Sequence, residues 1–471
     1  RGIMTANHDT VRRFHMHLFT KDKAFYRQFF SLLLFIALQN LVSYSVSLAD
    51  SIMLSNYSQN ALSGVTQANQ VQFLLQMIVT SAGEGVVVLA SQYWGKGEKK
   101  PIVPITAIGL TVAFVIGVVF TCVVSLAPRQ IMCLLSDEEA IIREGVDYLR
   151  VIRYTYLFYC LSTVILASLR SVESVRVGLV IMVMSLFVNI GLNYCLIFGK
   201  LGFAQMGTTG AAIATLAARA FEFVASCVYL FLMDKKLRIR PKQLFRFDRA
   251  LNHDYAKYAT PVMLAGASWG VAMFVQTAII GRMGTDAIAA NATVVSLFGM
   301  ISVFAYGAGN AAGVITGKLV GEGDDRKLRE YVRSMQGLFL VIGVVTGAAL
   351  YLLRYPILEF YHLETKGAHD IALQFTTVLA VTVVGTAYQA PCLGGIVRGG
   401  GHTKFVFYND LIFQWGVVLV LSALAQFVWK LEPVWVFLCL KSDQVLKCAV
   451  AVYEVNSYRW IRRLTREPAA K

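Results

Sequence analysis

Four side chains with oxygen donors lie inside long apolar stretches of this sequence. Asp50 follows an apolar run in SLAD, Asn189 and Asn193 lie in FVNIGLNYC, and Thr215 lies in GAAIATLAAR. The two asparagines are four residues apart, which places both amides on one face of a helix. One carboxylate, two amide oxygens and one hydroxyl suit a hard cation such as sodium, and the carboxylate alone suits a proton. We therefore predict a cation-coupling site at these four residues, with Na⁺ or H⁺ as its ion.

Each of these residues also has a purely structural interpretation. A lone asparagine or threonine in a membrane span often forms a hydrogen bond between helices. Asp50 lies near the end of its apolar run, where a carboxylate can cap a helix. Arg219 and Glu222 follow Thr215 and are three residues apart, so we expect them to form a local ion pair.

A second group of charges interrupts apolar segments near the end of the chain. Lys441, Asp443 and Lys447 lie in FLCLKSDQVLKCAV, and Asp410 lies in FYNDLIF. A charge at the centre of a membrane helix costs about 2.5 to 3.5 kcal/mol, so several of them need partners. Lys447 is four residues from Asp443 and at a depth similar to that of Asp410, which predicts ion pairs with both. A permanent ion network and a role in transport are both compatible with this pattern.

One further acid, Glu84, interrupts an apolar segment in SAGEGVVV. Its flanking glycines are compatible with a break in the helix, and the carboxylate itself is a candidate functional group. Lys441 does not share a helix face with Asp443, so we expect it to pair with Glu84 or with an anionic group of a substrate.

The usual signatures of enzymes are absent from the sequence. It contains no GxxxxGK[ST], no HExxH and no GxSxG, and its eight cysteines form no CxxC pair. We therefore expect no enzyme and no organic cofactor. An intramembrane enzyme that uses Asp443 and Lys441 is the alternative from another class.

The composition is that of a membrane protein with many spans. The chain has 471 residues, of which 56% are hydrophobic and 15% are charged, and its mean hydropathy is +0.59. Each bilayer crossing needs about 20 apolar residues. Twelve such runs are predicted at 29–54, 65–94, 102–127, 150–170, 177–199, 207–233, 258–280, 287–319, 331–353, 370–397, 404–428 and 433–455.

The basic residues lie in short connections and at both chain ends. They predict a cytoplasmic segment 1–28, a first lobe 29–233, a cytoplasmic linker 234–257, a second lobe 258–455 and a basic tail 456–471. By the positive-inside rule, both termini then lie in the cytoplasm. The net charge of +15 is then explained by basic residues that set the orientation in the membrane. We therefore do not expect nucleic-acid binding.

The two halves of the chain repeat one pattern. SIMLSNYSQNALSG matches TAIIGRMGTDAIAA without a gap, and GKGEKK matches GEGDDR at the same offset. Later in each half, Arg170 matches Arg398 and Arg219 matches Lys447. Six spans separate equivalent points, so the repeats are parallel and related by an axis along the membrane normal, as in many transporters.

Several segments resemble the multidrug and toxic compound extrusion (MATE) transporters: LQNLVSYSVSLADSIMLSNYSQNALSGV, ASQYWGKGEKK, TPVMLAGASWG, IIGRMGTDAIAAN and IVRGGGHTKF. The resemblance covers all twelve spans. It implies an all-helical fold of two six-helix lobes around a pseudo-twofold axis, and a monomer in the bacterial inner membrane. It also implies export of cationic or amphipathic drug-like compounds in exchange for H⁺ or Na⁺. A lipid-linked sugar flippase of the same superfamily is the alternative.

The resemblance also implies roles for single residues. Family members with a cation site in the first lobe use an aspartate, an asparagine and a threonine that match Asp50, Asn189 and Thr215. Asn193 stands where those members have a second aspartate. The missing carboxylate weakens the expectation of tight sodium binding and leaves proton coupling more open.

Overall fold

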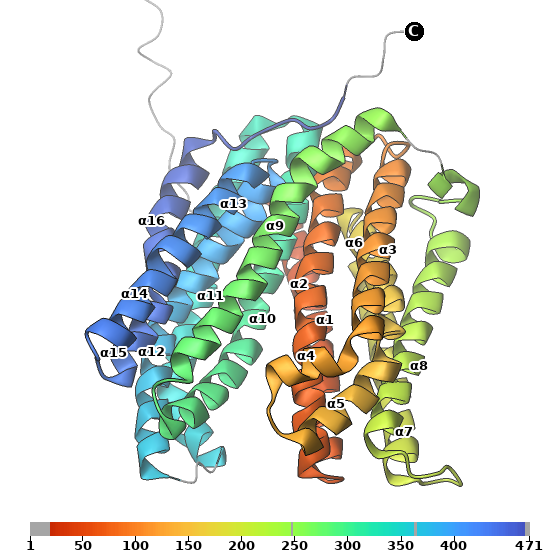
Figure 1. Ribbon diagram of the computed structural model, residues 1–471. Coiled ribbons are helices and arrows are strands. Elements are labelled where there is room, and N and C mark those ends of the chain that lie inside the picture. The colour runs from red at the N-terminus through yellow and green to blue at the C-terminus, as the bar shows by residue number, and fades with distance from the viewer. Residues whose placement is uncertain (1–18, 246–247, 362–364, 467–471) are drawn as a thin grey trace, which may run out of the picture.

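The protein is a bundle of long, nearly parallel helices (Figure 1). The computed structural model describes residues 19–245, 248–361 and 365–466. Within these residues the regular structure is entirely helical. Helices form their backbone hydrogen bonds within one segment, which suits the apolar interior of a membrane.

The helices divide into two consecutive sets, which form the two predicted lobes. The first lobe consists of α1 (Lys23–Ser55), α2 (Gln59–Gly95), α3 (Ile102–Leu126), α4 (Pro128–Leu135), α5 (Glu139–Ile152), α6 (Thr155–Ser171), α7 (Val175–Phe198), α8 (Gly207–Val228) and η1 (Tyr229–Met233). The short η2 (Pro241–Phe245) connects the lobes. The second lobe consists of α9 (Arg249–Ile280), α10 (Thr285–Glu322), α11 (Asp325–Phe360), α12 (Lys366–Ala390), η3 (Pro391–Val397), α13 (Thr403–Leu411), η4 (Ile412–Leu419), α14 (Val420–Ala423), η5 (Leu424–Val428), α15 (Pro433–Leu440) and α16 (Ser442–Ser457).

All twelve predicted spans are helical, but two of them differ from a single straight helix. In the described residues, ten helices are each long and apolar enough to cross a membrane. The pair α5 and α6, bent by 56°, makes an eleventh. The twelfth predicted span is divided into α15 and α16 at Lys441, whose φ of −107° and ψ of 6° are not helical.

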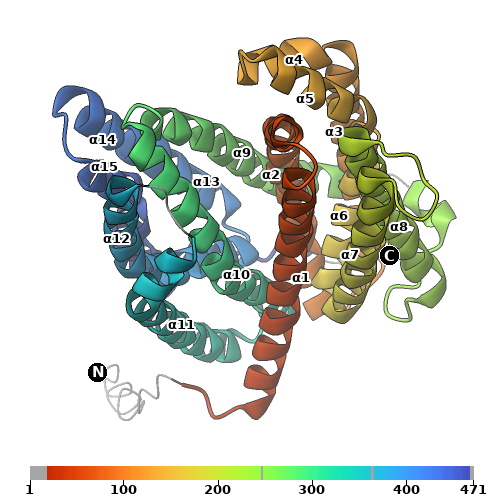
Figure 2. The same ribbon diagram turned by 90° about the horizontal axis from the view of Figure 1, so that it is seen from below.

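The lobes meet closely at one end of the molecule. We call this end the terminal face, because it carries residues 19 and 466, the first and last that are described (Figure 1). A Cβ atom on Gly95 would lie 1.9 Å from the Lys318 carbonyl oxygen, and one on Gly321 would lie 1.9 Å from the Gln92 carbonyl oxygen. Glycine at these positions therefore lets α2 and α10 touch through their backbones. At the other end the helices of the two lobes diverge (Figures 1 and 2).

The C-terminal residues also join the lobes at the terminal face. After α16 the chain crosses over the helix ends toward α2 and α9 (Figure 1). The Leu464 amide donates to Gln92 Oε1 on α2 of the first lobe at 2.8 Å. Arg466 pairs with Asp254 on α9, in its own lobe, at 2.6 Å. The last five residues of the predicted basic tail lie outside the described part of the chain.

The N-terminal residues make a similar connection to the second lobe. The Thr20 amide donates to Ser334 Oγ on α11 at 2.8 Å, and Tyr331 of α11 donates to the Asp22 carboxylate. The phenol of Tyr331 stabilises the charged carboxylate and lowers the pKa of Asp22. Each end of the described chain is thus bonded to the lobe that it does not belong to. Residues 1–18 of the predicted cytoplasmic segment lie outside the described residues.

Candidate functional site

The four predicted cation-site residues lie together in the first lobe. Asp50 comes from α1, Asn189 and Asn193 from α7, and Thr215 from α8, and α7 contacts both other helices. The Asn193 side-chain amide donates to Asp50 Oδ1 and, at 3.1 Å, to Asn189 Oδ1. The Asn189 amide in turn donates to Thr215 Oγ1 at 3.4 Å. The residues therefore form one chain of hydrogen bonds from α1 to α8.

The amide of Asn193 has one unused hydrogen-bonding atom. Asn193 is fully buried, and its Oδ1 has no hydrogen-bond partner among the described residues. A buried acceptor without a donor costs free energy, which suggests that another state of the site supplies one. The two candidates are a bound cation and a proton carried by the neighbouring Asp50.

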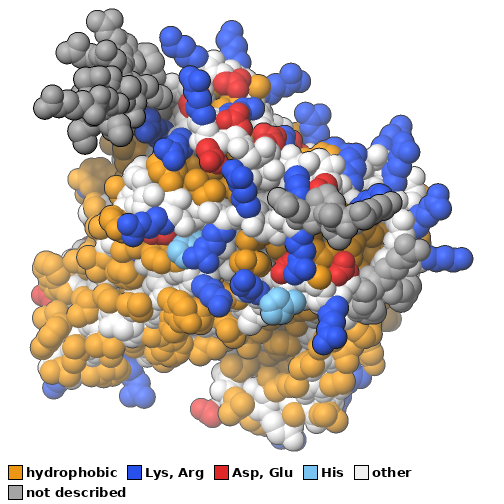
Figure 3. All heavy atoms as spheres, turned by 90° about the horizontal axis from the view of Figure 1, so that it is seen from above, with side chains coloured by type: hydrophobic (Ala, Val, Ile, Leu, Met, Phe, Trp, Pro, Cys, Tyr) orange, Lys and Arg blue, Asp and Glu red, His pale blue; other side chains and the backbone are white. Residues whose placement is uncertain are grey.

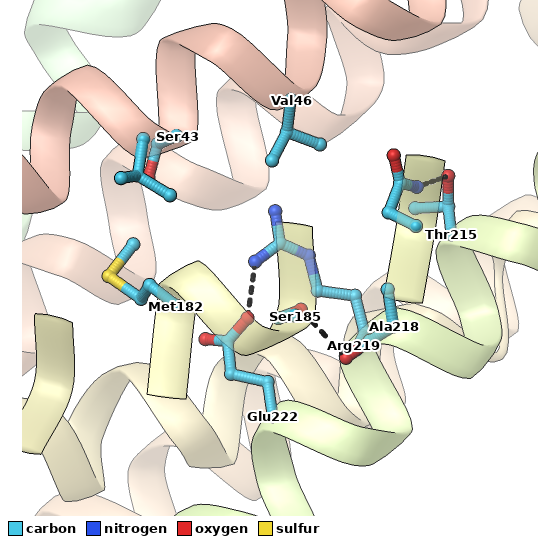
Figure 4. A pocket seen from close by; sticks show the side chains of 10 residues that line it. Ser43, Val46, Met182, Ser185, Thr215, Ala218, Arg219 and Glu222 are labelled. Atoms are coloured by element: carbon cyan, nitrogen blue, oxygen red, sulfur yellow. Dashed lines mark hydrogen bonds and ion pairs between the residues drawn. The ribbon is translucent and has the colours of Figure 1, made fainter. Parts of the chain in front are cut away.

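A small cavity adjoins this chain of hydrogen bonds. It has a volume of about 20 Å³, enough for one water molecule, and its lining includes Asn189, Thr215, Arg219 and Glu222 (Figure 4). Arg219 Nη1 lies 2.7 Å from Glu222 Oε2, which confirms the expected ion pair. Figure 4 shows the guanidinium pointing from α8 toward Val46 of α1.

The partners of this ion pair fix its position. The Arg219 guanidinium lies 4.9 Å from the centre of the Tyr159 ring. Ser162 donates to Glu222 Oε1 at 3.2 Å. The guanidinium also interacts electrostatically with Asp50. Arg219 therefore forms an ion pair with a carboxylate of its own helix and lies within electrostatic range of the Asp50 carboxylate on α1.

These residues do not fit a sodium ion well. Sodium needs several free oxygen ligands and a negative site. Here the Asn189 and Thr215 oxygens already accept hydrogen bonds, and Arg219 and Glu222 neutralise each other, so Asp50 supplies the one uncompensated negative charge among these residues. Among the described residues, no group of three or more histidine, cysteine, aspartate or glutamate side chains is placed to hold a metal ion.

Tyr148 of α5 belongs to the same site and was not predicted from the sequence. It is 4% exposed and interacts with Thr215 and with the Asp50 charge. The helix that carries it is amphipathic and lies before the apolar run predicted at 150–170. Tyr148 could therefore not be assigned to the membrane region from an apolar run in the sequence.

The second-lobe charges form the predicted ion network. Lys447 Nζ lies 2.9 Å from Asp410 Oδ1 and 3.5 Å from Asp443 Oδ2. Lys447 is 5% exposed, whereas the Asp410 side chain is 40% exposed. The network thus has a buried cation and one carboxylate that solvent can reach.

Lys441 does not pair with Glu84, the one partner within the chain that the sequence suggested for it. Its ammonium lies 4.9 Å from the centre of the Phe298 ring and 5.6 Å from that of Phe437. These aromatic faces attract a cation without neutralising it. Lys441 is therefore outside the network of Lys447, and the predicted pair with Glu84 is wrong.

Glu84 is instead paired with two arginines. Arg170 of α6 bonds to Glu84 Oε1, and Arg398 lies 3.5 Å from Glu84 Oε2. These arginines are equivalent positions of the two repeats, so both lobes converge on one carboxylate. The suggested helix break is also wrong, because α2 continues through Glu84. Its flanking glycines serve close packing, since a Cβ on Gly85 would lie 2.4 Å from the Ala259 Cβ.

Comparisons with known proteins identify the family of this chain. The profile of the MatE family matches residues 36–195 and 261–424. "Probable multidrug resistance protein NorM" of Thermotoga maritima is 24% identical over 438 residues, covering 91% of this chain and 92% of the relative. "Uncharacterized transporter YisQ" of Bacillus subtilis is 22% identical over 381 residues, covering 80% and 82%.

Solved structures share the fold. A MOP superfamily transporter from Pyrococcus furiosus superposes with a TM-score of 0.84 at 18% identity, covering 93% of this chain and 98% of that chain. A variant of the MATE transporter VcmN from Vibrio cholerae gives a TM-score of 0.84 at 14% identity, with coverage of 94% and 98%. From the family profile and the shared two-lobe fold, we conclude that this chain belongs to the MatE family of membrane transporters.

Proposed function

We propose that this protein is a secondary active exporter of cationic or amphipathic organic compounds, driven by proton entry through Asp50. The observation that carries the proposal is the pairing of Asp50 with Asn193, whose amide oxygen is buried without a partner. Membership of the MatE family and the multidrug resistance names of several relatives support the substrate class. The sodium alternative is less well supported because the Asn189 and Thr215 oxygens already accept hydrogen bonds and Asn193 adds no second carboxylate beside Asp50.

The amide of Asn193 can bond to Asp50 in either protonation state. When Asp50 is charged, the Asn193 amide nitrogen donates to it, as described above. When Asp50 is protonated, its hydroxyl becomes a donor and the free Asn193 oxygen becomes the acceptor after the amide rotates. That rotation removes the Asn193 donor from Asn189 Oδ1, so protonation changes the contact between α1 and α7. Asp50 would thus link proton binding to helix position.

Alternating access follows from the way the lobes are joined. The terminal face is closed by the α2 and α10 backbones and by the chain ends, while the helices diverge at the other end. We infer that the terminal face is cytoplasmic, because basic side chains gather there. A substrate between the lobes would leave from the divergent end while a proton reaches Asp50.

Efflux from proteoliposomes tests this proposal. An imposed proton gradient should drive an amphipathic dye cation against its gradient in the unmodified protein. Asp50→Asn should abolish this transport while leaving the fold intact, because asparagine keeps the shape and the hydrogen bonds but cannot take up a proton. Asp147→Asn is the matched control in the same lobe, since the Asp147 side chain is 42% exposed and its one ion pair among the described residues is with Arg150. A lipid-linked sugar flippase would move no dye cation in this assay.

A further inference from the structure

A basic cleft opens where the two lobes meet near the terminal face. It has a volume of about 540 Å³ and lies between the first turns of α1 and α7, the end of α8 and the last turns of α10. Its charged lining residues are Arg27, Glu173, Arg176 and Lys318. The terminal face around it carries many lysine and arginine side chains (Figure 3). The proposed cation site and the second-lobe charges use none of these residues.

The charges of the cleft do not cancel. Lys318 Nζ lies 2.7 Å from Glu173 Oε1, so these two neutralise each other. Arg27 and Arg176 form no ion pair with any described residue. Two guanidinium groups therefore remain for an anionic ligand, and guanidinium groups bind phosphate oxygens by paired hydrogen bonds.

A neutral donor on the cleft wall is also unused. The side-chain nitrogen of Gln28 is buried and has no hydrogen-bond partner in the described part of the chain. A buried amide donor without an acceptor is costly, and a phosphate oxygen in the cleft would satisfy it. The vacant hydrogen bond thus points to the same ligand chemistry as the two arginines.

Apolar surface continues from the cleft along the membrane-facing helices. Val177 lines the cleft, and Val180 and Met184 follow at helical spacing on α7 with exposed fractions of 58% and 50%. Arg176 lies over the Phe35 ring of α1 at 5.2 Å. A basic site at the membrane surface with an apolar path below it has the two parts that a phospholipid needs.

We propose that this cleft binds the phosphate-bearing headgroup of an anionic phospholipid, whose acyl chains lie along α1 and α7. Arg27 and Arg176 hold the headgroup phosphate, and Gln28 donates to it. Lys318 belongs to α10 of the second lobe, and its ion pair with Glu173 forms one wall of the cleft. The bound lipid therefore touches both lobes where they are closed, and it stabilises this conformation over one that opens the terminal face.

Native mass spectrometry of the full chain in detergent tests the binding. We expect dioleoyl phosphatidylglycerol to remain bound in preference to dioleoyl phosphatidylcholine. The double variant Arg27→Gln with Arg176→Gln should weaken phosphatidylglycerol binding about thirtyfold, at about fivefold for each basic group. The matched control is Lys242→Gln with Arg326→Gln, which removes the same charge from exposed residues of the terminal face outside the cleft.

Three results would overturn the lipid assignment. An equal loss of phosphatidylglycerol binding in the control variant would mean that the whole terminal face attracts lipid. Equal binding of phosphatidylcholine would mean that the negative charge is not recognised. Displacement by glycerol 3-phosphate at the same concentration as lipid would mean that the cleft binds a free phosphate and has no use for the acyl chains.

A second measurement does not depend on the variant folding. A phosphatidylglycerol with a photoreactive acyl chain, added to the unmodified protein, should label α7 near Val180 and Met184 or the neighbouring face of α1, and labelling confined to other helices would contradict the proposal. Neither measurement involves transport, so a failure of the lipid proposal is distinct from a failure of the proposed proton coupling.

Discussion

In the proposed mechanism, Asn193 is the residue on which the identity of the coupling ion depends most directly. With Asn193 neutral, the site contains the carboxylates of Asp50 and Glu222 and the guanidinium of Arg219, which leaves one negative charge. One proton on Asp50 removes that charge. Two adjacent carboxylates would instead create the stronger negative field that sodium requires. The residue type at a single position therefore separates the two coupling modes.

Asn193→Asp should introduce sodium dependence. The added carboxylate would lie next to Asp50 and would raise the negative charge of the site by one. Dye efflux driven by an imposed sodium gradient, absent in the unmodified protein, should become measurable in this variant. Asn193→Ala is the control, because it removes the amide without adding charge. A folded Asn193→Asp protein that shows no response to sodium would contradict this account of ion choice.

The second-lobe network predicts unequal effects for its two kinds of charge. Lys447→Met leaves two carboxylates without a cation and should destabilise the protein by about 3 kcal/mol, the lower end of the range for breaking a buried pair. The lower end applies because the Asp410 side chain is 40% exposed. Asp443→Asn should be much milder, since Lys447 keeps its 2.9 Å contact with Asp410. Thermal unfolding in detergent measures the stability of both variants. An equal loss of stability in Lys447→Met and Asp443→Asn would contradict an arrangement in which Lys447 neutralises both carboxylates.

At the scale of single helices, hydropathy predicted most elements and missed those with mixed sequences. Every apolar run became a helix, because a membrane leaves few other solutions. The helix α5 was missed because its charged and apolar residues alternate at helical spacing, which lowers its mean hydropathy. The four-residue spacing of Asn189 and Asn193 predicted a shared face. The partners of Glu84 could not be predicted, because they depend on how α2 packs against α6 and η3.

The turn before α13 supplies a pH prediction. His402 Nδ1 lies 3.0 Å from Glu454 Oε1, and burial lowers the pKa of the imidazole below its ordinary value of about 6.5. Unfolding exposes the ring, so the unfolded chain binds a proton that the folded protein does not. Stability from this residue is therefore complete above about pH 6.5 and falls as the pH decreases below that value. His402→Asn should reduce the fall in melting temperature between pH 7 and pH 5.5, and an unchanged slope would contradict the assignment.

At the scale of the whole molecule, the closed terminal face is held by buried contacts between the lobes. Gln92 of α2 is fully buried and makes several of these contacts. Its side-chain nitrogen lies 3.4 Å from the Gly399 carbonyl oxygen and 3.2 Å from that of Arg462, and its oxygen accepts from Leu464 at 2.8 Å. The repeat pattern predicted two lobes. No sequence pattern predicted the contacts between the C-terminal residues and α2, because these contacts join residues far apart in the sequence.

Gln92→Ala should favour the conformation that opens the terminal face. The change leaves three backbone groups without partners, at a cost of about 1 to 3 kcal/mol to the closed state. Spin labels at Lys100, on an exposed turn of the first lobe, and at Arg326, at the exposed start of α11 in the second lobe, should report a longer distance in a larger fraction of molecules. Gln59→Ala, at the exposed start of the same helix, is the control. An unchanged distance distribution would mean that these bonds do not hold the lobes together.

Separate proton and sodium gradients, applied to proteoliposomes that contain the unmodified protein or Asp50→Asn, test the central claim most directly. The account predicts that a proton gradient alone drives dye efflux in the unmodified protein, that a sodium gradient alone does not, and that Asp50→Asn removes the proton-driven flux. Proton-driven efflux that survives in Asp50→Asn would contradict the claim that this carboxylate couples ion entry to export.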